Sequence, residues 1–300
     1  MNKVAKRTVT GLAVGAGVIA LFLFCPLKAL IPVLLVLSAL VQLEFYQMAK
    51  AYQPVTWFGL LMGTAWLTAV AAWPGVGFLG VAMGLPAGLM LATFLLALVV
   101  LFRSRYERPI SSLAVTLAGV LYVPFLLSFF LRTVQMGEIP ADEYGLFAMP
   151  LGRVGLYTLL YLVAVAKFSD TGGFAFGLSF GKHKLCPTIS PNKSWEGLLG
   201  SMVFAAATTC AFLAVARHFA WAEVVPAWGY LTYPRAIALG AVLALVATAG
   251  DLIESRFKRE CGVKDSATFM PAGMGGFLDM FDSILFIPAL ASPVFVLTEL

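Results

Sequence analysis

Long apolar stretches recur from one end of the chain to the other, and short connectors between them carry most of the charged residues. A helix needs roughly 20 predominantly apolar residues to cross the hydrocarbon core of a bilayer. Nine stretches approach that length: 8–25, 29–49, 56–75, 77–102, 111–131, 151–170, 197–217, 234–254 and 280–298. Because the edges of such stretches are imprecise, eight or ten spans fit the pattern as well. The pattern predicts an all-α, polytopic bundle of about nine transmembrane helices.

The composition is that of a membrane protein. The chain of 300 residues is 61% hydrophobic and 12% charged, against roughly 45–50% and about 25% in soluble domains. No long polar stretch leaves room for a separate soluble domain, so we expect one integral membrane domain over residues 1–300. Residues 1–155 form its amino-terminal spans, whereas residues 156–300 carry most of the polar residues that need a chemical explanation.

The amino-terminal segment imitates a signal peptide, because Lys3, Lys6 and Arg7 precede an apolar core. No small-x-small cleavage site follows that core. We therefore expect the segment to remain in the protein as the first span.

Lys and Arg are distributed unevenly between the two sides of the predicted bundle. With the amino terminus in the cytoplasm, fourteen of the 20 lie on the cytoplasmic side, five on the other side, and Lys167 within a span. Cytoplasmic loops carry an excess of these residues, so we expect this orientation. The net charge of +5 reflects this bias and one basic site. No basic stripe with interleaved aromatic residues indicates nucleic-acid binding.

Three polar segments stand out in the second half, all on the predicted cytoplasmic side. They are KFSDTGGFAFG (167–177), TISPNKSWEG (188–197) and GDLIESRFKRECGVKD (250–265), the last of which continues to residue 283. Asp251 and Glu254 are three residues apart, and so are Asp279 and Asp282. Side chains at this spacing share one face of a helix, and a carboxylate inside a bilayer costs at least about 2.5 kcal/mol. We therefore expect both faces to point inward, toward a polar site.

Carboxylates gathered in one place repel one another unless a cation lies between them. The acidic candidates are Asp170, Asp251, Asp279 and Asp282. One suitable cation is Mg²⁺, which commonly binds one or two carboxylates and the phosphates of a substrate. The other suitable cations are the basic side chains of Lys193, Lys258, Arg259 and Lys264. Both signs in one region favour a phosphate site built from metal and basic side chains.

Simpler roles are open for single residues in these segments. Lys258 and Arg259 could anchor a helix end at the interface, and Ser194 could be the N-cap of the helix that follows it. Glu44, near the cytoplasmic end of the second predicted span, either reaches the interface or lines a polar cavity. Only the three segments together favour a functional site.

The last polar segment resembles the signature of phosphatidate cytidylyltransferases, also called CDP-diacylglycerol synthases. That signature is S-x-x-K-R-x4-K-D, then a Pro-Gly-His-Gly-Gly turn, then D-R-x-D. The matching residues are Ser255, Lys258, Arg259, Lys264, Asp265, Pro271, Gly275, Gly276, Asp279 and Asp282. KFSDTGGFAFGLSFGKHKL and ISPNKSWEG also resemble blocks of this family, so the specific likeness covers about residues 160–285.

Two departures from the family signature lie in this segment. Met274 stands in place of the His, with one extra residue between Pro271 and Gly275, and Met280 stands in place of the Arg. The chain thus lacks a proton donor and a cation that the family has. The retained K-D, G-G and D-x-x-D elements argue against an inactive enzyme and leave reduced or altered activity open.

The resemblance implies that the protein joins CTP and phosphatidic acid to give CDP-diacylglycerol and pyrophosphate. Such a reaction needs no protein nucleophile, because an oxygen of the lipid phosphate can attack the α-phosphorus directly. We expect Mg²⁺ as cofactor, with room for a second cation. The expected metal ligands are Asp251 and Asp279, with Asp282 and Asp170 in the first or second coordination shell.

The remaining site residues are expected to contact the substrates. Lys258, Arg259 and Lys264 would hold phosphate oxygens, and Asp265 would orient Lys264 or accept a hydrogen bond from the cytosine or ribose. The nucleotide side would be closed by Ser190, Lys193 and Glu196. A glycine turn that includes Gly275 and Gly276 would let the backbone approach a phosphate closely.

Two other functions remain open. A CTP-dependent lipid kinase of the polyprenol type needs similar sites but moves the γ-phosphoryl group. An ion-coupled carrier also uses intramembrane aspartates, but it predicts repeats with interrupted helices in both halves, and the polar segments occur only in the second. The resemblance further implies a homodimer. From the distribution of Lys and Arg we expect a protein of the inner cell membrane with its active site on the cytoplasmic side.

Overall fold

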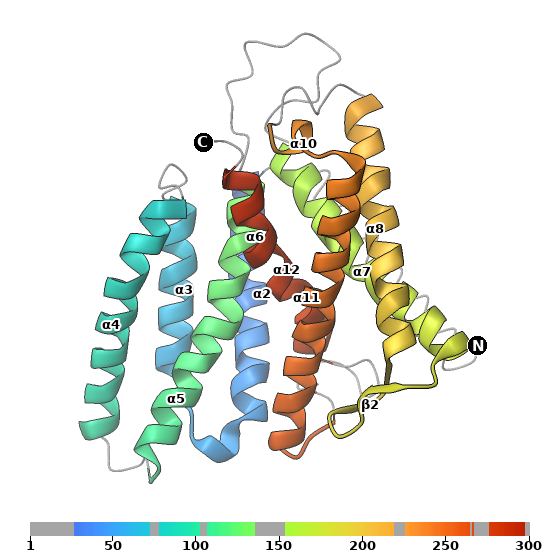
Figure 1. Ribbon diagram of the computed structural model, residues 1–300. Helices are drawn as coiled ribbons and strands as arrows, with labels where there is room; N and C mark the ends of the chain where they lie inside the picture. Colours follow the sequence, from blue (N-terminus) through green and yellow to red (C-terminus); the bar gives the residue numbers. More distant parts are fainter. Residues whose placement is uncertain are drawn as a thin grey trace, which may run out of the picture.

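The computed structural model describes residues 27–72, 78–102, 107–135, 154–218, 226–264, 266 and 276–297. Nearly all of these residues are helical (Figure 1). The first predicted span, 8–25, lies outside the described residues. Every other predicted span coincides with a described helix, so the all-α class is confirmed.

The described elements follow one another in this order. They are α2 (Leu27–Met48), η1 (Lys50–Tyr52), α3 (Thr56–Ala72), α4 (Phe78–Phe102), α5 (Pro109–Val120), η2 (Leu121–Phe125), α6 (Leu126–Gln135), α7 (Val154–Phe180), β1 (Lys184–Cys186), β2 (Ser190–Ser194), α8 (Trp195–His218), α10 (Pro226–Gly229), α11 (Tyr233–Glu260) and α12 (Phe277–Leu297). The segment η2 is a π-helical turn that contains Pro124 and joins α5 to α6. A proline has no N–H for the regular helical bond, which explains the widened turn at this point.

Among the described residues, five helical stretches are long and apolar enough to cross a membrane. They are Ile31–Met48, Pro109–Gln135, Gly155–Phe180, Trp195–His218 and Tyr233–Glu260. At 1.5 Å per residue, even the 22 residues of α2 span roughly 33 Å, close to the roughly 30 Å of a bilayer core. The bundle therefore has the make-up of an integral membrane protein, while the total of nine spans stays a prediction.

Two helices continue past the predicted ends of their spans. The prediction ended one span at residue 170 and another at residue 254, but α7 runs to Phe180 and α11 runs to Glu260. Both ends were set where polar residues begin. The helix α7 continues because its glycines allow close packing on α8: a Cβ at Gly172 would meet the carbonyl oxygen of Gly200 at 2.5 Å.

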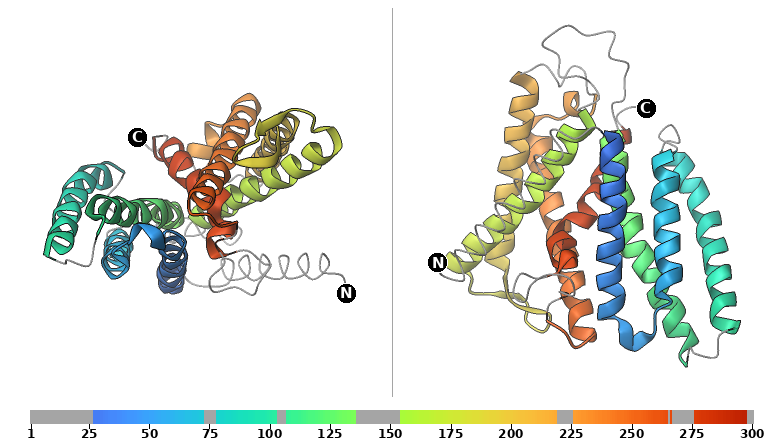
Figure 2. Two further views of the ribbon diagram at one scale, coloured as in Figure 1. Left: turned by 90° about the horizontal axis from the view of Figure 1, so that it is seen from below. Right: turned by 180° about the vertical axis from the view of Figure 1, so that it is seen from behind.

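The helix α12 lies between two groups of helices. The amino-terminal group, α2 to α6, lies on one side, and α7, α8 and α11 lie on the other (Figures 1 and 2). The helix α12 contacts α2 and α6 from the first group and α7 and α11 from the second. Side chains from both halves of the sequence can therefore contribute to a site on α12.

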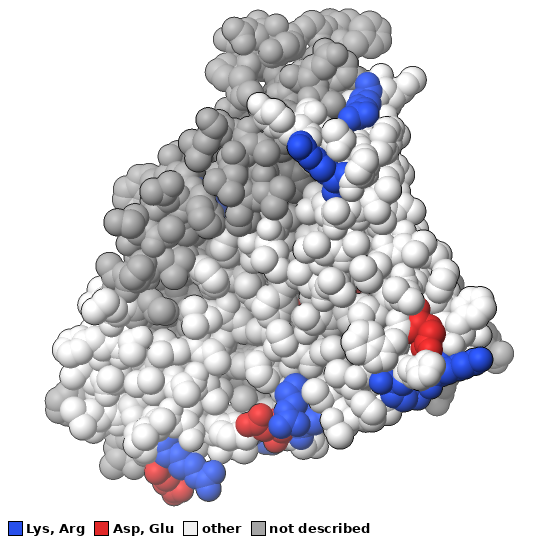
Figure 3. Space-filling view, in the orientation of Figure 1, with Lys and Arg blue, Asp and Glu red and all other residues white. Residues whose placement is uncertain are grey.

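The connectors that were predicted to face the cytoplasm share one end of the molecule. The turn between α2 and α3, the β1–β2 hairpin and the last turn of α11 all lie at the lower end in Figure 1. Charged side chains gather along the same edge, below a broad belt with almost no charge (Figure 3). Large apolar side chains are 60–77% exposed, as expected of a lipid-facing belt; examples are Leu61, Met90, Phe94, Phe174 and Leu178.

A buried polar network holds the amino-terminal group together. The Tyr46 hydroxyl donates to the carbonyl of Thr116 at 2.8 Å, and the Gln42 amide donates to that hydroxyl at 3.0 Å and to the Gly59 carbonyl at 2.9 Å. Hydrogen-bonded pairs of this kind join transmembrane helices. The network ties α2 to α3 and α5, and thereby fixes the rotation of α2.

Candidate active site at the junction of α11 and α12

The three polar segments of the sequence meet at one place in the fold. They lie on the second half of α7, on the β1–β2 hairpin with the start of α8, and on the end of α11 with the start of α12. The hairpin was not predicted, and it is antiparallel, with Lys184 paired to Ser194 and Cys186 paired to Ser190. The Ser194 hydroxyl accepts the Gly197 N–H at 3.1 Å, which confirms Ser194 as the N-cap of α8.

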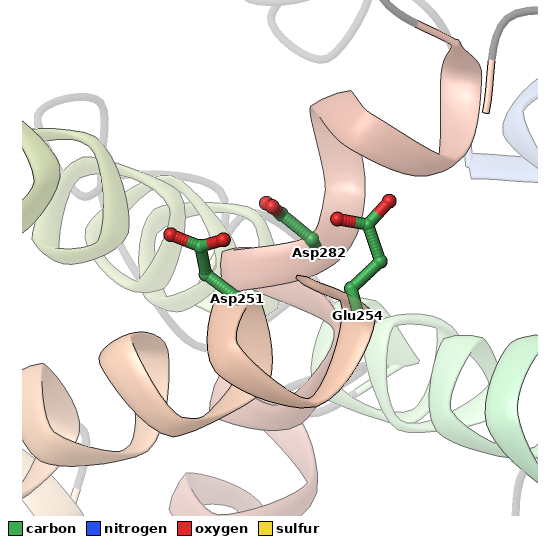
Figure 4. Close-up of side chains that lie close together, drawn as sticks. All are labelled: Asp251, Glu254 and Asp282. Atoms are coloured by element: carbon green, nitrogen blue, oxygen red, sulfur yellow. The ribbon is translucent and has the colours of Figure 1, made fainter. Parts of the chain in front are cut away.

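Three carboxylates form the centre of the site. Oxygens of Asp251, Glu254 and Asp282 lie within 4.8 Å of one another. Asp251 and Glu254 extend from α11, and Asp282 extends from α12 into the same space (Figure 4). Glu254 is completely buried, and the two aspartates are partly buried. This arrangement confirms the expectation that the acidic faces of the two helices point inward, toward each other.

The close approach of α11 and α12 depends on Gly250. A Cβ at this position would lie 2.7 Å from the carbonyl oxygen of Asp282 and 2.9 Å from the ring of Phe286. Since these are backbone and aromatic atoms of α12, they cannot move away easily. Glycine at position 250 therefore sets the distance across which the carboxylates of the two helices face one another.

A lysine from the hairpin reaches the acidic centre. The ammonium of Lys193, in β2, lies 2.6 Å from Oδ2 of Asp251 and donates to the Thr248 carbonyl at 3.3 Å. Both side chains of the pair are less than one third exposed. Lys193 thus attaches the hairpin to α11 at the carboxylate that lies nearest to it.

Lys258 connects the acidic centre to the start of α12. Its ammonium lies 2.6 Å from Oε2 of Glu254 and 2.8 Å from Oδ1 of Asp279. The other oxygen of Asp279 accepts the N–H of Gly276 at 2.6 Å and that of Ser266 at 3.2 Å. Asp279 therefore holds a lysine and two backbone amides, and it lies outside the group that Asp251, Glu254 and Asp282 form.

The charges of the site do not balance. The site holds four carboxylates, those of Asp251, Glu254, Asp279 and Asp282, and two ammonium groups. Lys193 pairs with Asp251, and Lys258 pairs with Glu254 and Asp279. When all six groups are ionised, the site carries two uncompensated negative charges. One divalent cation would supply that difference.

Asp170 borders the site from α7. Its Oδ2 accepts a hydrogen bond from the Ser283 hydroxyl at 3.0 Å and lies 3.7 Å from the ammonium of Lys167. Ser283 follows Asp282 directly, so this bond fixes α7 against the turn of α12 that carries Asp282. Asp170 is placed beside the acidic centre and is not one of its three members.

Glu196 supports the base of the hairpin. Its carboxylate accepts the backbone N–H groups of Lys182 at 3.2 Å and His183 at 3.3 Å, and it lies 2.6 Å from Nδ1 of His183. The Arg259 guanidinium donates to the Ile189 carbonyl at 3.5 Å, a long contact that joins the end of α11 to the hairpin turn. These contacts hold the hairpin over the site.

The predicted site residues divide into three sets. Asp251 and Asp282 belong to the acidic centre, Lys193 and Lys258 pair with it, and Asp279 pairs with Lys258. Asp170, Glu196, Arg259 and Gly276 make the contacts described above with elements that border the acidic centre, whereas Ser190 lies in β2 and Lys264 follows α11. Of these residues, Arg259 and Lys264 are exposed. Those outside the described residues are Asp265 and Gly275, together with Pro271 and Met274.

Glu254 was missing from the predicted ligands. The sequence held a signal for it, because it is three residues from Asp251 and shares a helical face with it. Asp279 and Asp282 have the same spacing, although only Asp282 belongs to the acidic centre. Spacing alone therefore does not tell which residue of a pair faces the centre.

Comparison with known proteins identifies similar chains. A family model described as the cytidylyltransferase family matches residues 5–297. The chain is 40% identical over 130 residues to a protein of Haemophilus influenzae and 39% identical over 136 residues to one of Staphylococcus aureus, and both are named phosphatidate cytidylyltransferase. A Mycobacterium leprae protein of the same name is 40% identical over 145 residues.

These alignments cover 43%, 44% and 48% of this chain. They cover 42%, 46% and 42% of the respective relatives, so the chain spans less than half the length of the curated relatives it matches.

Proposed function

Because the chain belongs to the cytidylyltransferase family, we propose that it transfers the cytidylyl group of CTP to phosphatidic acid, giving CDP-diacylglycerol and pyrophosphate. The names of the similar proteins support this choice of substrates. The observation that carries it is the group of carboxylates and lysines at the junction of α11 and α12. That group combines the charges that a nucleotide and its metal require with a position on membrane-spanning helices.

The reaction is a displacement at phosphorus. An oxygen of the lipid phosphate forms a bond to the α-phosphorus of CTP, and the bond from that phosphorus to the oxygen bridging to the β-phosphorus breaks. Pyrophosphate leaves with the electron pair of the broken bond. No covalent intermediate with the protein is needed, so the protein acts by aligning the two phosphates and neutralising their charge.

The acidic centre fits a magnesium ion. Mg²⁺ prefers hard oxygen ligands, and the three carboxylates offer such oxygens within 4.8 Å of one another. With all six groups ionised, the site has two uncompensated negative charges, which match one divalent ion. Asp251, Glu254 and Asp282 would hold the ion, which when bound neutralises charge on the CTP phosphates. Asp279 and Asp170 would act beside this set, and a second cation would find ligands among them.

The basic residues would bind the phosphates of the substrates. Lys258 is held in place by Glu254 and Asp279, so its ammonium is oriented before substrate arrives. Lys193 belongs to the hairpin and would contact the nucleotide together with Ser190, while Glu196 keeps the hairpin in position. Arg259 and Lys264 are exposed, and they would bind the phosphate oxygens of a substrate that arrives from solvent. Roles for Asp265, Gly275 and Gly276 at the bound phosphates complete the proposal.

The proposal includes a membrane topology. The chain would form nine spans with its amino terminus in the cytoplasm, and the site would open to the cytoplasmic face of the inner membrane. The excess of Lys and Arg on that side supports this orientation. So does the shared position of the corresponding connectors at one end of the fold. A homodimer is part of the same proposal.

Labelled CTP tests the proposed reaction. The purified chain in detergent is given Mg²⁺, phosphatidic acid or diacylglycerol, and CTP labelled at the α- or the γ-phosphorus. We expect label from the α position in lipid, dependent on phosphatidic acid. Label from the γ position would make the protein a lipid kinase, and no label from folded protein would favour a carrier.

A pair of variants ties the activity to the site. Asp282→Asn removes one carboxylate of the acidic centre and should reduce the rate by roughly 100-fold or more. Glu260→Gln is the control: Glu260 is also at the cytoplasmic end of α11, but it is exposed and accepts a hydrogen bond from Tyr52 at 3.1 Å. Equal rates for the two variants would contradict the placement of the active site.

A further inference from the structure

We propose that Glu44 is a positioning residue for the active site, and that its carboxylate fixes the first turn of α12 by accepting the N–H of Leu278. The effect on catalysis rests on the proposed function. The contact itself does not, and it is measured separately below.

Glu44 belongs to the amino-terminal half of the chain. It lies on α2, is completely buried, and accepts the Leu278 N–H on Oε2 at 2.9 Å. Because the side chain is buried, it packs inside the protein and is not an exposed anchor on its surface. The contact joins residues 234 positions apart, so it attaches the start of α12 to a helix from the other half of the fold.

The first N–H groups of a helix have no partner within the helix. In α12 two carboxylates share this region: Asp279 accepts the N–H of Gly276, and Glu44 accepts that of Leu278. A negative charge here is also favourable to the helix dipole. Since Glu44 is held on α2, it restricts how the first turn of α12 can rotate and shift.

The turn that Glu44 restricts is next to the carboxylates of the proposed active site. Asp279 follows Leu278 directly and binds Lys258, and Asp282 lies one helical turn further on and belongs to the acidic centre. A rotation of this turn would therefore move both aspartates at once. Because misplacement of reacting groups by about 1 Å can cost on the order of 100-fold in rate, the anchor matters for turnover.

Gly276 provides an independent observation. A Cβ at this position would lie 2.5 Å from Oε2 of Glu44 and would also collide with the Ser266 hydroxyl. The sequence suggested that Gly276 lets the backbone approach a phosphate. In the fold it also lets the backbone pass beside Oε2 of Glu44, the same oxygen that accepts the Leu278 N–H.

The test measures hydrogen exchange of the Leu278 amide in the full chain, reconstituted in lipid nanodiscs, together with kcat and KM. Glu44→Gln keeps an oxygen acceptor, and Glu44→Leu removes it. We expect the Leu278 amide to stay protected in Glu44→Gln and to exchange in Glu44→Leu. The kcat should fall by roughly 10- to 100-fold only in Glu44→Leu, with the KM for CTP nearly unchanged.

Gln42→Leu is the matched control. Gln42 is also buried on α2 and also makes polar contacts, but with Tyr46 and Gly59. This variant should lose stability while the Leu278 amide stays protected and kcat per folded molecule is kept. If Gln42→Leu lowered kcat as much as Glu44→Leu does, Glu44 would be one more structural residue and the proposal would be wrong.

Gly276→Ala disturbs the contact between Glu44 and Leu278 from the α12 side. It replaces Glu44→Leu in the test if that variant does not fold. We expect its added methyl group to displace the Glu44 carboxylate and expose the Leu278 amide to exchange. Continued protection of that amide in either variant would overturn the proposal. The two results can also separate. If the wild-type chain labelled no lipid, but Glu44→Leu exposed the Leu278 amide to exchange, the proposed function would be refuted and the role of Glu44 in positioning α12 would stand.

Discussion

Lys258→Met is predicted to destabilise the protein strongly. The lysine is 14% exposed and lies between Glu254, which is completely buried, and Asp279, which is 17% exposed. Methionine keeps most of the length of the side chain but removes the charge, so two carboxylates lose their cation. Breaking a buried ion pair by removing one partner costs about 3–5 kcal/mol. We expect a loss of this order, because the distances of 2.6 and 2.8 Å indicate direct contact.

Lys167→Met is the matched comparison. Lys167 lies 3.7 Å from Asp170, and both side chains are about half exposed. An exposed pair contributes about 0–1 kcal/mol, so the two substitutions, identical in chemistry, should differ by at least about 2 kcal/mol. The assay is reversible unfolding of the purified variants in mixed micelles, followed by circular dichroism against denaturant.

Equal losses for Lys258→Met and Lys167→Met would refute this reasoning about burial. Magnesium offers a second measurement on the same protein. Without Lys258, the four carboxylates of the site face one ammonium instead of two. Added Mg²⁺ should therefore stabilise Lys258→Met more than it stabilises the wild type. The same shift in both would contradict the proposed metal site.

Three further predictions concern other parts of the fold. Gly250→Ala should separate α11 from α12 and reduce kcat at least about tenfold, whereas Gly88→Ala, where an added Cβ meets no atom within 4 Å, should not. Glu196→Ala should release two backbone amides and speed tryptic cleavage of the hairpin, and His183→Ala, which keeps those amides bonded, should have a smaller effect. Burial raises the pKa of the Cys261 thiol, so less of it is thiolate at pH 8 than in a free cysteine. In a variant whose other cysteines are serine, alkylation at pH 8 should be slower than that of a free cysteine, and an ordinary rate at pH 8 would contradict its burial.

The sequence predicted the helices well because their signal is local. Apolar stretches of the right length mark α2, α8 and α11 without knowledge of their neighbours. The polar segments were also recognised as one site, since carboxylates in a membrane protein need partners. The helices α7 and α11 continue past the ends of the predicted spans, because packing on neighbouring helices decides where these helices stop.

Other features of the site could not be read from local patterns. Asp251 and Asp279 were expected as the main metal ligands, but only the rotation of α12 determines that Asp282 faces Glu254 while Asp279 turns to Lys258. The hairpin escaped prediction because its short strands have no alternating apolar pattern; contacts with Glu196 and α11 hold it. The partner of Glu44 could not be predicted from the sequence, because Leu278 lies 234 residues further along the chain.

The bond between Glu44 and Leu278 has a consequence for biosynthesis. Chains are made from the amino end at roughly 5–20 residues per second, so Glu44 waits roughly 10–50 s for an amide that lies 234 residues later. During that time the ribosome still holds the chain, and the Glu44 carboxylate on α2 lacks the hydrogen bond from the Leu278 amide. A chain that stops before α12 never forms the hydrogen bond between Leu278 and Glu44. The amino-terminal helices thus enter the membrane early but reach their final form only when α12 docks.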